Sequence, residues 1–171
     1  VAMADGYSRA SGQLSACNVH VAPGLGNAMG ALYNAKFTGT PMILTAGQQE
    51  QGHGLTEPLL YEPLVPIAQP LVKWAIEVTR LEDLPRIVRR AAKVAMTPPT
   101  GPVYLSISAE LLHREGLEAQ IGEDAHYQIE RPGPARANTV EAIARRLGEA
   151  QCPVLMFGDD VWREGAQAEA M

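Results

Sequence analysis

The apolar residues of the chain form short, strand-like runs separated by longer segments in which they recur every three or four positions. The runs at 14–21, 41–47, 71–78 and 103–109 have the length and composition expected of strands, and 41–47 is almost continuously apolar, as a buried parallel strand is. Helices are predicted at 27–37 and after residue 82. Strands that alternate with helices predict an α/β fold, in which a parallel sheet has helices on both faces.

Local signals predict where several of these elements begin and end. An alanine-rich helix at the start of the chain should stop at Gly12. Thr79 and Glu82 have the spacing of a capping box for the later helix, and the proline-rich stretch 59–70 is predicted to be irregular. The apolar stripe of that later helix consists of Leu84, Ile87, Val88, Ala91, Val94 and Ala95.

The character of the chain changes after residue 110, which predicts a second folded unit. Residues 111–137 are charged, weakly periodic and end in a Pro/Gly-rich stretch typical of a linker. A new helix is expected from Asn138, with Glu141 three residues on, followed by a strand at 152–160. We therefore predict a first domain at 1–110, a linker at 111–137 and the start of a second α/β domain at 138–171. Because both ends interrupt helical patterns, we expect an internal segment of a longer protein. The apolar stripe of the new helix consists of Val140, Ile143, Ala144 and Leu147.

Composition and charge exclude several classes of partner. The net charge is −5, and the 14 basic residues form no run or stripe, which argues against nucleic acid. No apolar run approaches the roughly 20 residues of a membrane span. Cys17 and Cys152 each lie in an apolar run without a CxxC pattern, so we expect buried thiols in a reducing, cytoplasmic compartment.

The stretch "NVHVAPGLGNAMGAL", residues 18–32, places three glycines where a strand is predicted to give way to a helix. Gly24, Gly26 and Gly30, with Glu50 about 20 residues further on, approximate a dinucleotide-binding fingerprint. Met29 occupies the position of the third glycine, which lowers that hypothesis without removing it, and a P-loop is excluded because no GK[ST] follows. The purely structural alternative is that the glycines only allow a tight turn and close helix packing.

Two histidines are candidates for chemistry. His20 ends the first strand four residues before Gly24, at the edge where open α/β sheets bind ligands, although a lone histidine is more often a hydrogen-bonded core residue. His53 lies between two glycines in a polar loop, where a solvated side chain is the default expectation. The His, Cys, Asp and Glu residues show no metal-ligand spacing anywhere, so no metal ligand is predicted on this chain.

The order of the motifs resembles that of a known family. "ADGYSRASG", "HVAPGLGNAMGALYNA", "TPMILTAGQQ", "PLVKW" and "GPVYLSI" are similar to the N-terminal, pyrimidine-binding domain of thiamine-diphosphate-dependent enzymes. The resemblance is dense over residues 1 to about 110, and the benzoylformate decarboxylases have counterparts of most of these motifs. Within the family, acetolactate synthases lack a histidine at the position of His20, so that residue favours a decarboxylase or lyase branch. "APGLG" departs from the decarboxylase pattern, which has a less proline-like loop.

The resemblance implies a 2-keto acid decarboxylase or carboligase. Thiamine diphosphate would bridge two subunits of a homodimer or homotetramer, with its pyrimidine on this domain and its diphosphate and Mg²⁺ on the partner's C-terminal domain. An activating glutamate would lie upstream of Val1. His20 would be catalytic, as a proton relay or carboxylate-binding group. Six further matches, together with Gln49, would contact the cofactor: Pro23, Gly24, Leu25, Gly26, Asn27 and Gln48.

Three alternatives remain at this stage. The first is an acetolactate synthase-like carboligase of the same family, and the second is a Rossmann-type NAD-binding domain that uses Gly24, Gly26 and Glu50. The third is a regulatory or assembly domain that keeps the fold without catalysis. The substrate class expected from the resemblance is a small 2-keto acid, and neither a nucleic acid nor a membrane is expected as partner.

Overall fold

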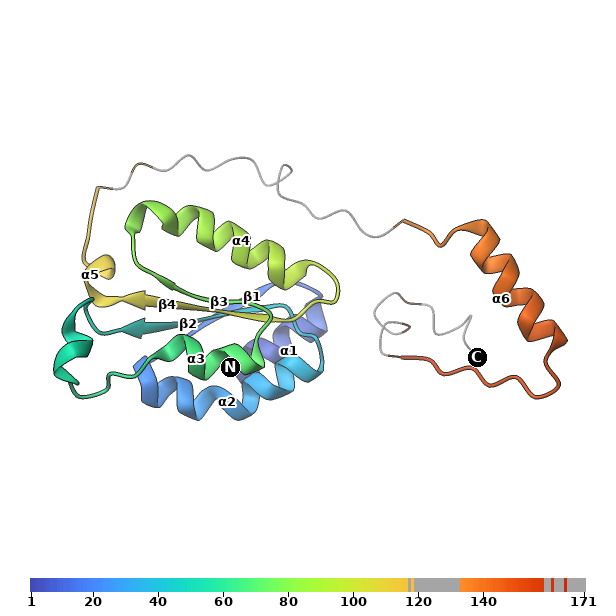
Figure 1. Ribbon diagram of the computed structural model, residues 1–171, viewed down its shortest axis with the longest axis horizontal. Helices are drawn as coiled ribbons and strands as arrows, with labels where there is room; N and C mark the ends of the chain where they lie inside the picture. The colour runs from blue at the N-terminus through green and yellow to red at the C-terminus, as the bar shows by residue number, and fades with distance from the viewer. Residues whose placement is uncertain (117, 119–132, 159–160, 162–164, 166–171) are drawn as a thin grey trace. The chain divides into compact units, whose positions relative to one another are not determined.

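The computed structural model describes residues 1–116, 118, 133–158, 161 and 165, and it divides the chain into two compact units, 1–130 and 131–171. The first unit is an α/β fold with four parallel strands (Figure 1). Three 3₁₀ turns, at His53–Thr56, Gln69–Leu71 and Leu81–Asp83, interrupt its connections. Its other elements are α1 (Ala2–Ser11), β1 (Ser15–Val19), α2 (Val21–Phe37), β2 (Met42–Gln48), α3 (Leu64–Ala68), β3 (Ala75–Val78), α4 (Leu84–Met96), β4 (Pro102–Ser108) and α5 (Ala109–Leu112).

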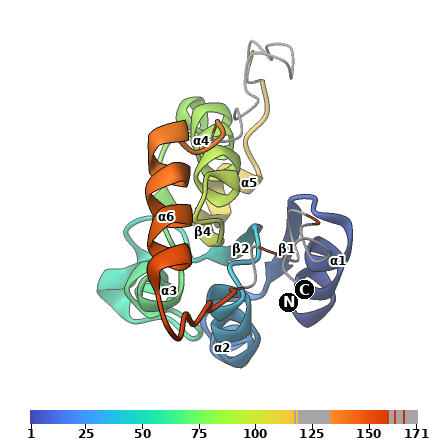
Figure 2. The same cartoon turned by 90° about the vertical axis from the view of Figure 1, so that its right-hand side faces the viewer.

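The sheet has the strand order β1-β2-β4-β3, with all neighbours parallel, so β1 and β3 form its edges. Helices α2 and α3 lie on one side and α4 on the other, as Figure 2 shows in a second view. The predicted parallel sheet with helices on both faces is therefore confirmed. Each face has its own apolar cluster, because side chains alternate between the faces along every strand.

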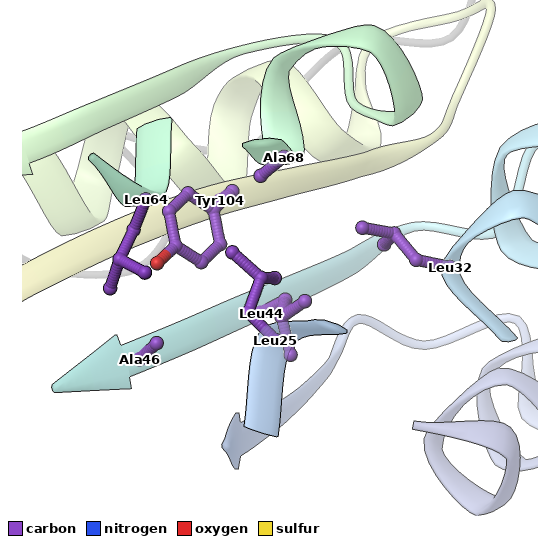
Figure 3. Packing of buried hydrophobic residues seen from close by; sticks show 7 residues of the cluster. All are labelled: Leu25, Leu32, Leu44, Ala46, Leu64, Ala68 and Tyr104. Atoms are coloured by element: carbon purple, nitrogen blue, oxygen red, sulfur yellow. The ribbon is translucent and has the colours of Figure 1, made fainter. Parts of the chain in front are cut away.

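The larger cluster lies between the sheet and helices α2 and α3. Tyr104 at its centre is fully buried, with side chains from both helices and from β2 around it (Figure 3). The smaller cluster joins β2 and β4 to Ala91 and Ala95 of α4, on the predicted stripe of that helix. Val88, assigned to the same stripe, is exposed instead. The main cluster consists of Leu25, Leu32, Leu44, Ala46, Leu64, Ala68 and Tyr104.

Helix α1 ends as predicted at Gly12, which adopts a left-handed conformation with φ of 69°. The helix is fastened to the turn before β2 by polar side chains. The Ser8 hydroxyl is 1 % exposed and donates to the carbonyl of Pro41 at 2.7 Å. The buried Thr40 hydroxyl donates to Asp5 Oδ1 at 2.6 Å. Buried polar groups paired in this way stabilise the fold, whereas the same groups unpaired would destabilise it.

Several predicted boundaries are wrong, and each has a local cause. Residues 59–70 are not wholly irregular, because α3 and a 3₁₀ turn form between their prolines. The third strand begins at Ala75 instead of residue 71, since that 3₁₀ turn occupies its predicted start. No capping box forms at Thr79 and Glu82: a 3₁₀ turn precedes α4, whose first turn contains Pro85, a favoured position for proline.

The second unit contains α6 (Ala137–Glu149). Its N-cap is Arg136, so the predicted cap Asn138 lies inside the helix. Residues 152–158 do not form the predicted strand, which needs a hydrogen-bonded partner, and the described part of this unit contains no other strand. The predicted stripe of α6 is largely exposed within the described residues. The boundaries 1–110, 111–137 and 138–171 remain a prediction, and residues 159–160 of the expected strand lie outside the described residues.

The two cysteines are free thiols, and neither is buried as predicted. Cys152 is exposed within its unit, whereas Cys17 on β1 is half-buried. Burial raises the pKa of the Cys17 thiol, which keeps it protonated and unreactive.

Candidate functional site

The carboxyl ends of the parallel strands meet at one edge of the sheet, where open α/β sheets bind ligands. Val19 at the end of β1 lies beside Ala46 of β2, and Gln48 at the end of β2 lies beside Ser108 of β4. His20 follows β1 directly. The register therefore brings His20 and Gln48, which were both predicted as site residues, to the same edge.

His20 is the only residue between β1 and α2, so strand and helix are joined without a loop. Its backbone is extended, with φ −92° and ψ 110°, and it is the N-cap of α2 without a side-chain capping bond. The next residue, Val21, has φ of 36°, in the left-handed region that β-branched residues rarely adopt. The His20 side chain is exposed at this corner and is available to a ligand.

The expected glycine loop does not exist, because α2 begins at Val21 and includes Gly24 and Gly26. Gly24 is closely packed: a Cβ there would lie 3.2 Å from the carbonyl carbon of Val19 and 3.3 Å from its Cβ, which is tighter than an ordinary van der Waals contact. A Cβ on Gly26 would meet nothing within 4 Å, so that position opens onto free space. The prediction of a loop ahead of a helix that starts near residue 27 is therefore wrong, although the close approach expected of a glycine holds at Gly24.

The structure also argues against the NAD-binding alternative. It needs a glycine-rich turn ahead of the helix, but Gly24 and Gly26 lie within α2. Its acidic residue, Glu50, lies in an exposed segment, where its carboxylate is 3.7 Å from His53 Nε2. His53 is exposed beside Glu50, in agreement with the default expectation of a solvated loop histidine.

The predicted cofactor contacts on α2 divide into two groups. Pro23, Gly26 and Asn27 are exposed along the first turns of the helix. Leu25 is fully buried against the sheet, close to Leu44 (Figure 3), so it anchors the helix in the core. The exposed group is therefore the part of α2 that can touch a bound molecule.

The two predicted glutamines fasten a segment of chain at this edge. Gln48 is 4 % exposed; its Nε2 donates to the carbonyl of Glu62 at 2.9 Å and its Oε1 accepts from the Gln49 N–H at 2.8 Å. Gln49 Nε2 donates to the carbonyl of Leu59 at 3.0 Å. We call residues 50–63 the covering segment. The amides predicted to line the site hold this segment, whose Leu59 side chain is exposed.

Sequence reasoning missed a second pair of residues that hold the covering segment. Glu110 Oε1, at the start of α5, accepts from the Gln51 N–H at 3.1 Å, and Gln51 Nε2 donates to the carbonyl of Thr79 at 3.0 Å. These bonds tie the segment to the ends of β3 and β4. The bond between Gln51 and Glu110 spans 59 positions of the sequence, and the bond between Gln51 and Thr79 spans 28. No local sequence pattern indicates contacts over such distances.

A row of hydroxyl groups was also missed on β4. Tyr104, Ser106 and Ser108 alternate along the strand on its α2/α3 face and are fully buried. Among the described residues, the Ser108 hydroxyl has no hydrogen-bond partner. Glu77 of β3 lies beside Ser106, and burial, then the charge of Glu110, raise the pKa of its carboxyl group. The polar residues at every second position of an otherwise apolar strand were the available signal.

Comparisons with known proteins agree with this geometry. Residues 1–59 match the family described as thiamine pyrophosphate enzyme, N-terminal TPP binding domain. The whole chain is 38% identical, over 173 aligned residues, to a protein named benzoylformate decarboxylase from Pseudomonas aeruginosa, of which it covers 32%. An acetolactate synthase from Oryza sativa subsp. japonica is 27% identical over 91% of the chain and is covered to 24%.

Solved structures give the same result. The crystal structure of benzoylformate decarboxylase from Polynucleobacter necessarius superposes with a TM-score of 0.86 at 36% identity, covering 99% of this chain and 31% of that one. A 4-hydroxybenzoylformate decarboxylase from Rhodococcus jostii has a TM-score of 0.85 at 34% identity, covering 99% of this chain and 32% of that one.

The chain thus spans about a third of the length of the curated relative it matches at 38% identity. Both the family match and the solved structures assign the α/β unit, with His20 at its corner, to the same kind of domain. The first 59 residues match the N-terminal cofactor-binding domain of the thiamine pyrophosphate enzymes, and the whole chain is similar to benzoylformate decarboxylases.

Proposed function

We propose that this chain supplies the pyrimidine side of the cofactor site in a thiamine-diphosphate-dependent 2-keto acid decarboxylase or carboligase, similar to the benzoylformate decarboxylases. The observation that carries the proposal is the exposed His20 at the carboxyl end of β1, in a chain that is 38% identical throughout to a benzoylformate decarboxylase. A histidine at this corner is available for proton transfer to a molecule bound at the sheet edge.

The residues at this edge fit one part of the cofactor. The first turns of α2 expose Pro23, Gly26 and Asn27, and the position above Gly26 is open, which suits a flat, weakly polar ring. The basic residue of α2, Lys36, lies in the last turn of the helix, so α2 offers no cation to a diphosphate beside its first turns. We therefore assign the pyrimidine ring to Pro23, Gly26 and Asn27, and the diphosphate with its Mg²⁺ to a different domain of the full-length protein.

The chemistry divides between cofactor and protein. When bound, thiamine diphosphate supplies a nucleophilic carbon and an electron sink for the decarboxylation of a 2-keto acid. His20 holds or delivers a proton beside the reacting carbon, or binds the substrate carboxylate. Gln48 and Gln49 keep the covering segment in place, so that its exposed Leu59 forms an apolar boundary of the site.

The acetolactate synthase-like carboligase remains the second candidate, since acetolactate synthases match 91% of the chain. His20 favours the decarboxylase branch, because a proton-transfer group at this corner suits release of an aldehyde after loss of CO₂. A non-catalytic role is the third candidate, which turnover by the full-length protein would exclude.

Three further features belong to the same proposal. The subunits form a homodimer or homotetramer with the cofactor at their interface, since α2 exposes Tyr33 and Phe37, whose rings stack with centroids 6.5 Å apart. The enzyme is cytoplasmic, in line with its two free cysteines. No helix among the described residues is long and apolar enough to cross a membrane.

The test uses the full-length protein with thiamine diphosphate and Mg²⁺, assayed with benzoylformate and with pyruvate. We expect benzoylformate to be decarboxylated and His20→Ala to lower kcat by about 10²- to 10⁴-fold, the contribution typical of a positioned proton-transfer group. His113→Ala is the matched control, because His113 is also exposed but follows α5. An unchanged kcat in His20→Ala contradicts the catalytic role, and acetolactate formation from pyruvate without benzoylformate turnover favours the second candidate.

A further inference from the structure

The sharp corner between β1 and α2 contains a residue that the proposed chemistry does not use. Val21 has φ of 36° and is only 7 % exposed. A left-handed backbone is unfavourable for a side chain that branches at Cβ, and such residues persist only where the surroundings hold them. Glycine would adopt this conformation freely. A valine here needs an explanation beyond the turn itself.

The surroundings hold the corner from both sides. The Gly24 N–H donates to the carbonyl of His20 at 2.7 Å and closes the first helical turn. The bare Cα of Gly24 lets this turn lie against the end of β1, where a Cβ would lie 3.2 Å from the Val19 carbonyl carbon and 3.4 Å from His20 Cβ. The buried Val21 side chain fixes the same corner from within the core. Val19, Val21 and Gly24 therefore bracket His20.

His20 itself has no comparable anchor. It makes no side-chain capping bond to α2, and its side chain is exposed. The direction of its Cα–Cβ bond is consequently set by the backbone of residues 19–21. A single-residue connection is shorter than the usual two to six residues between a strand and a helix, which leaves the backbone little freedom.

We propose that Val21 is a positioning residue for His20: its buried, branched side chain locks the left-handed corner and so aims the imidazole at the open edge of the sheet. The strand–corner–helix arrangement follows the same logic as hydrolase elbows, in which a strained turn presents a reactive side chain at the top of a sheet. This inference rests on the proposed function for its kinetic consequence, but its structural consequence is independent of catalysis.

The test compares Val21→Gly with Val21→Thr in the full-length holoenzyme. Glycine keeps the left-handed φ without strain but removes the lock, whereas threonine keeps the branched shape. We expect Val21→Gly to lower kcat by about 10- to 100-fold with little change in KM, the loss typical of a misplaced catalytic group. Val21→Thr should restore most of kcat. Val88→Gly is the control, because Val88 is an exposed valine on α4, on the opposite side of the sheet from α2.

A second readout needs no turnover. The imidazole ¹³Cε1–¹H signal of His20 in the apoprotein, assigned by its loss in His20→Ala, should be single and dispersed in the wild type and in Val21→Thr. It should broaden or move towards the free-histidine position in Val21→Gly. If Val21→Gly does not fold, Val21→Ala, which removes only the branched methyl groups, takes its place in both measurements.

The outcomes separate the two proposals. A wild-type enzyme that turns over no 2-keto acid overturns the proposed function, while the His20 signal still decides the positioning role. An active Val21→Gly enzyme with unchanged kcat and an unchanged His20 signal overturns the positioning role alone. An equal loss of kcat in Val88→Gly would show that the loss is not specific to the corner and would also overturn the positioning role.

Discussion

Glu77 lies on the edge strand β3 beside Ser106, with its side chain partly buried. Burial, then the negative charge of Glu110, raise the pKa of this carboxyl group above its ordinary value of 4.5. The unfolded chain therefore releases the proton of Glu77 at a lower pH than the folded protein does. The contribution of Glu77 to stability is greatest below the ordinary pKa and declines as the pH rises through the window up to the raised value.

We predict that Glu77→Gln removes this decline. The amide has about the same size and no proton to lose, so the variant should be more stable than the wild type at pH 7 and about equally stable near pH 4. Urea unfolding at a series of pH values measures the difference. If the free energies of unfolding of the two proteins decline in parallel as the pH rises, another titratable group causes the decline, and Glu110 is the first to examine.

His20 and the glycines show how much of the site can be predicted from single residues. The strand-end position of His20 follows from periodicity, because an apolar run predicts where a strand stops. The burial of Leu25 and the bonds of Gln48 do not follow, since they depend on which elements pack together. The left-handed Val21 could not be expected from its residue type, which disfavours that conformation.

At the scale of elements, helix α1 is attached to the sheet by hydrogen bonds of single side chains, and each of these can be removed by one substitution. Ser8 is buried, and its hydroxyl donates to the carbonyls of Gln13 and Pro41, which joins the helix to the strand connection on either side. Ser11 is exposed, and its hydroxyl makes only local bonds: it donates to the carbonyl of Tyr7 at 2.8 Å and accepts from the Gln13 N–H at 3.2 Å.

We predict that Ser8→Ala lowers the free energy of unfolding by about 1–2 kcal/mol, because the buried hydroxyl that links α1 to the carbonyls of Gln13 and Pro41 is lost. Ser11→Ala should cost a few tenths of a kcal/mol, since Ser11 is exposed and its bonds are local. Urea unfolding gives the energies, and amide hydrogen exchange should quicken within α1 in Ser8→Ala only. Equal effects of the two substitutions would show that Ser8 does not anchor the helix.

The start of α2 explains why element boundaries were harder to predict than element types. Proline and glycine normally interrupt helices, so "APGLG" predicts a loop. In the first turn, however, the missing N–H of Pro23 costs nothing, and Gly24 is needed for contact with Val19. Local helix propensity was overridden by packing against the end of β1, which is a tertiary effect.

At the scale of the whole molecule, the outer face of α2 is the surface most suited to assembly. Phe37 is 81 % exposed and stacks on Tyr33 of the preceding turn. Neighbouring α1 exposes Met3 and Tyr7. Large apolar side chains gathered on adjacent elements are typical of protein interfaces.

We predict that Phe37→Asp shifts the full-length protein towards smaller species, because a buried, unpaired carboxylate opposes association. Sedimentation velocity over a range of concentrations measures this shift. Val88→Asp is the control, since Val88 is also exposed but lies on α4, on the opposite side of the sheet. An unchanged sedimentation profile for Phe37→Asp would remove this face from the proposed interface.

The overall architecture was predicted more completely than its details. Alternating strands and helices indicated a parallel sheet, and the ordered motifs indicated the family. The strand order β1-β2-β4-β3 was not predicted, because periodicity does not determine where each crossover places its strand. The attachment of the covering segment was not predicted for the same reason, since its partners are distant in the sequence.

The attachment of the covering segment has a consequence for behaviour in salt. Side-chain amides of Gln48, Gln49 and Gln51 donate to backbone carbonyls, so these three bonds are between uncharged groups. Dissolved ions screen charges but leave such bonds almost unchanged. The three amide bonds should therefore hold the covering segment from dilute buffer to molar salt, while the bond from the Gln51 N–H to the Glu110 carboxylate is the one that salt weakens. Any ionic-strength dependence of turnover would then report the encounter with a negatively charged substrate, not a loosening of the protein around it.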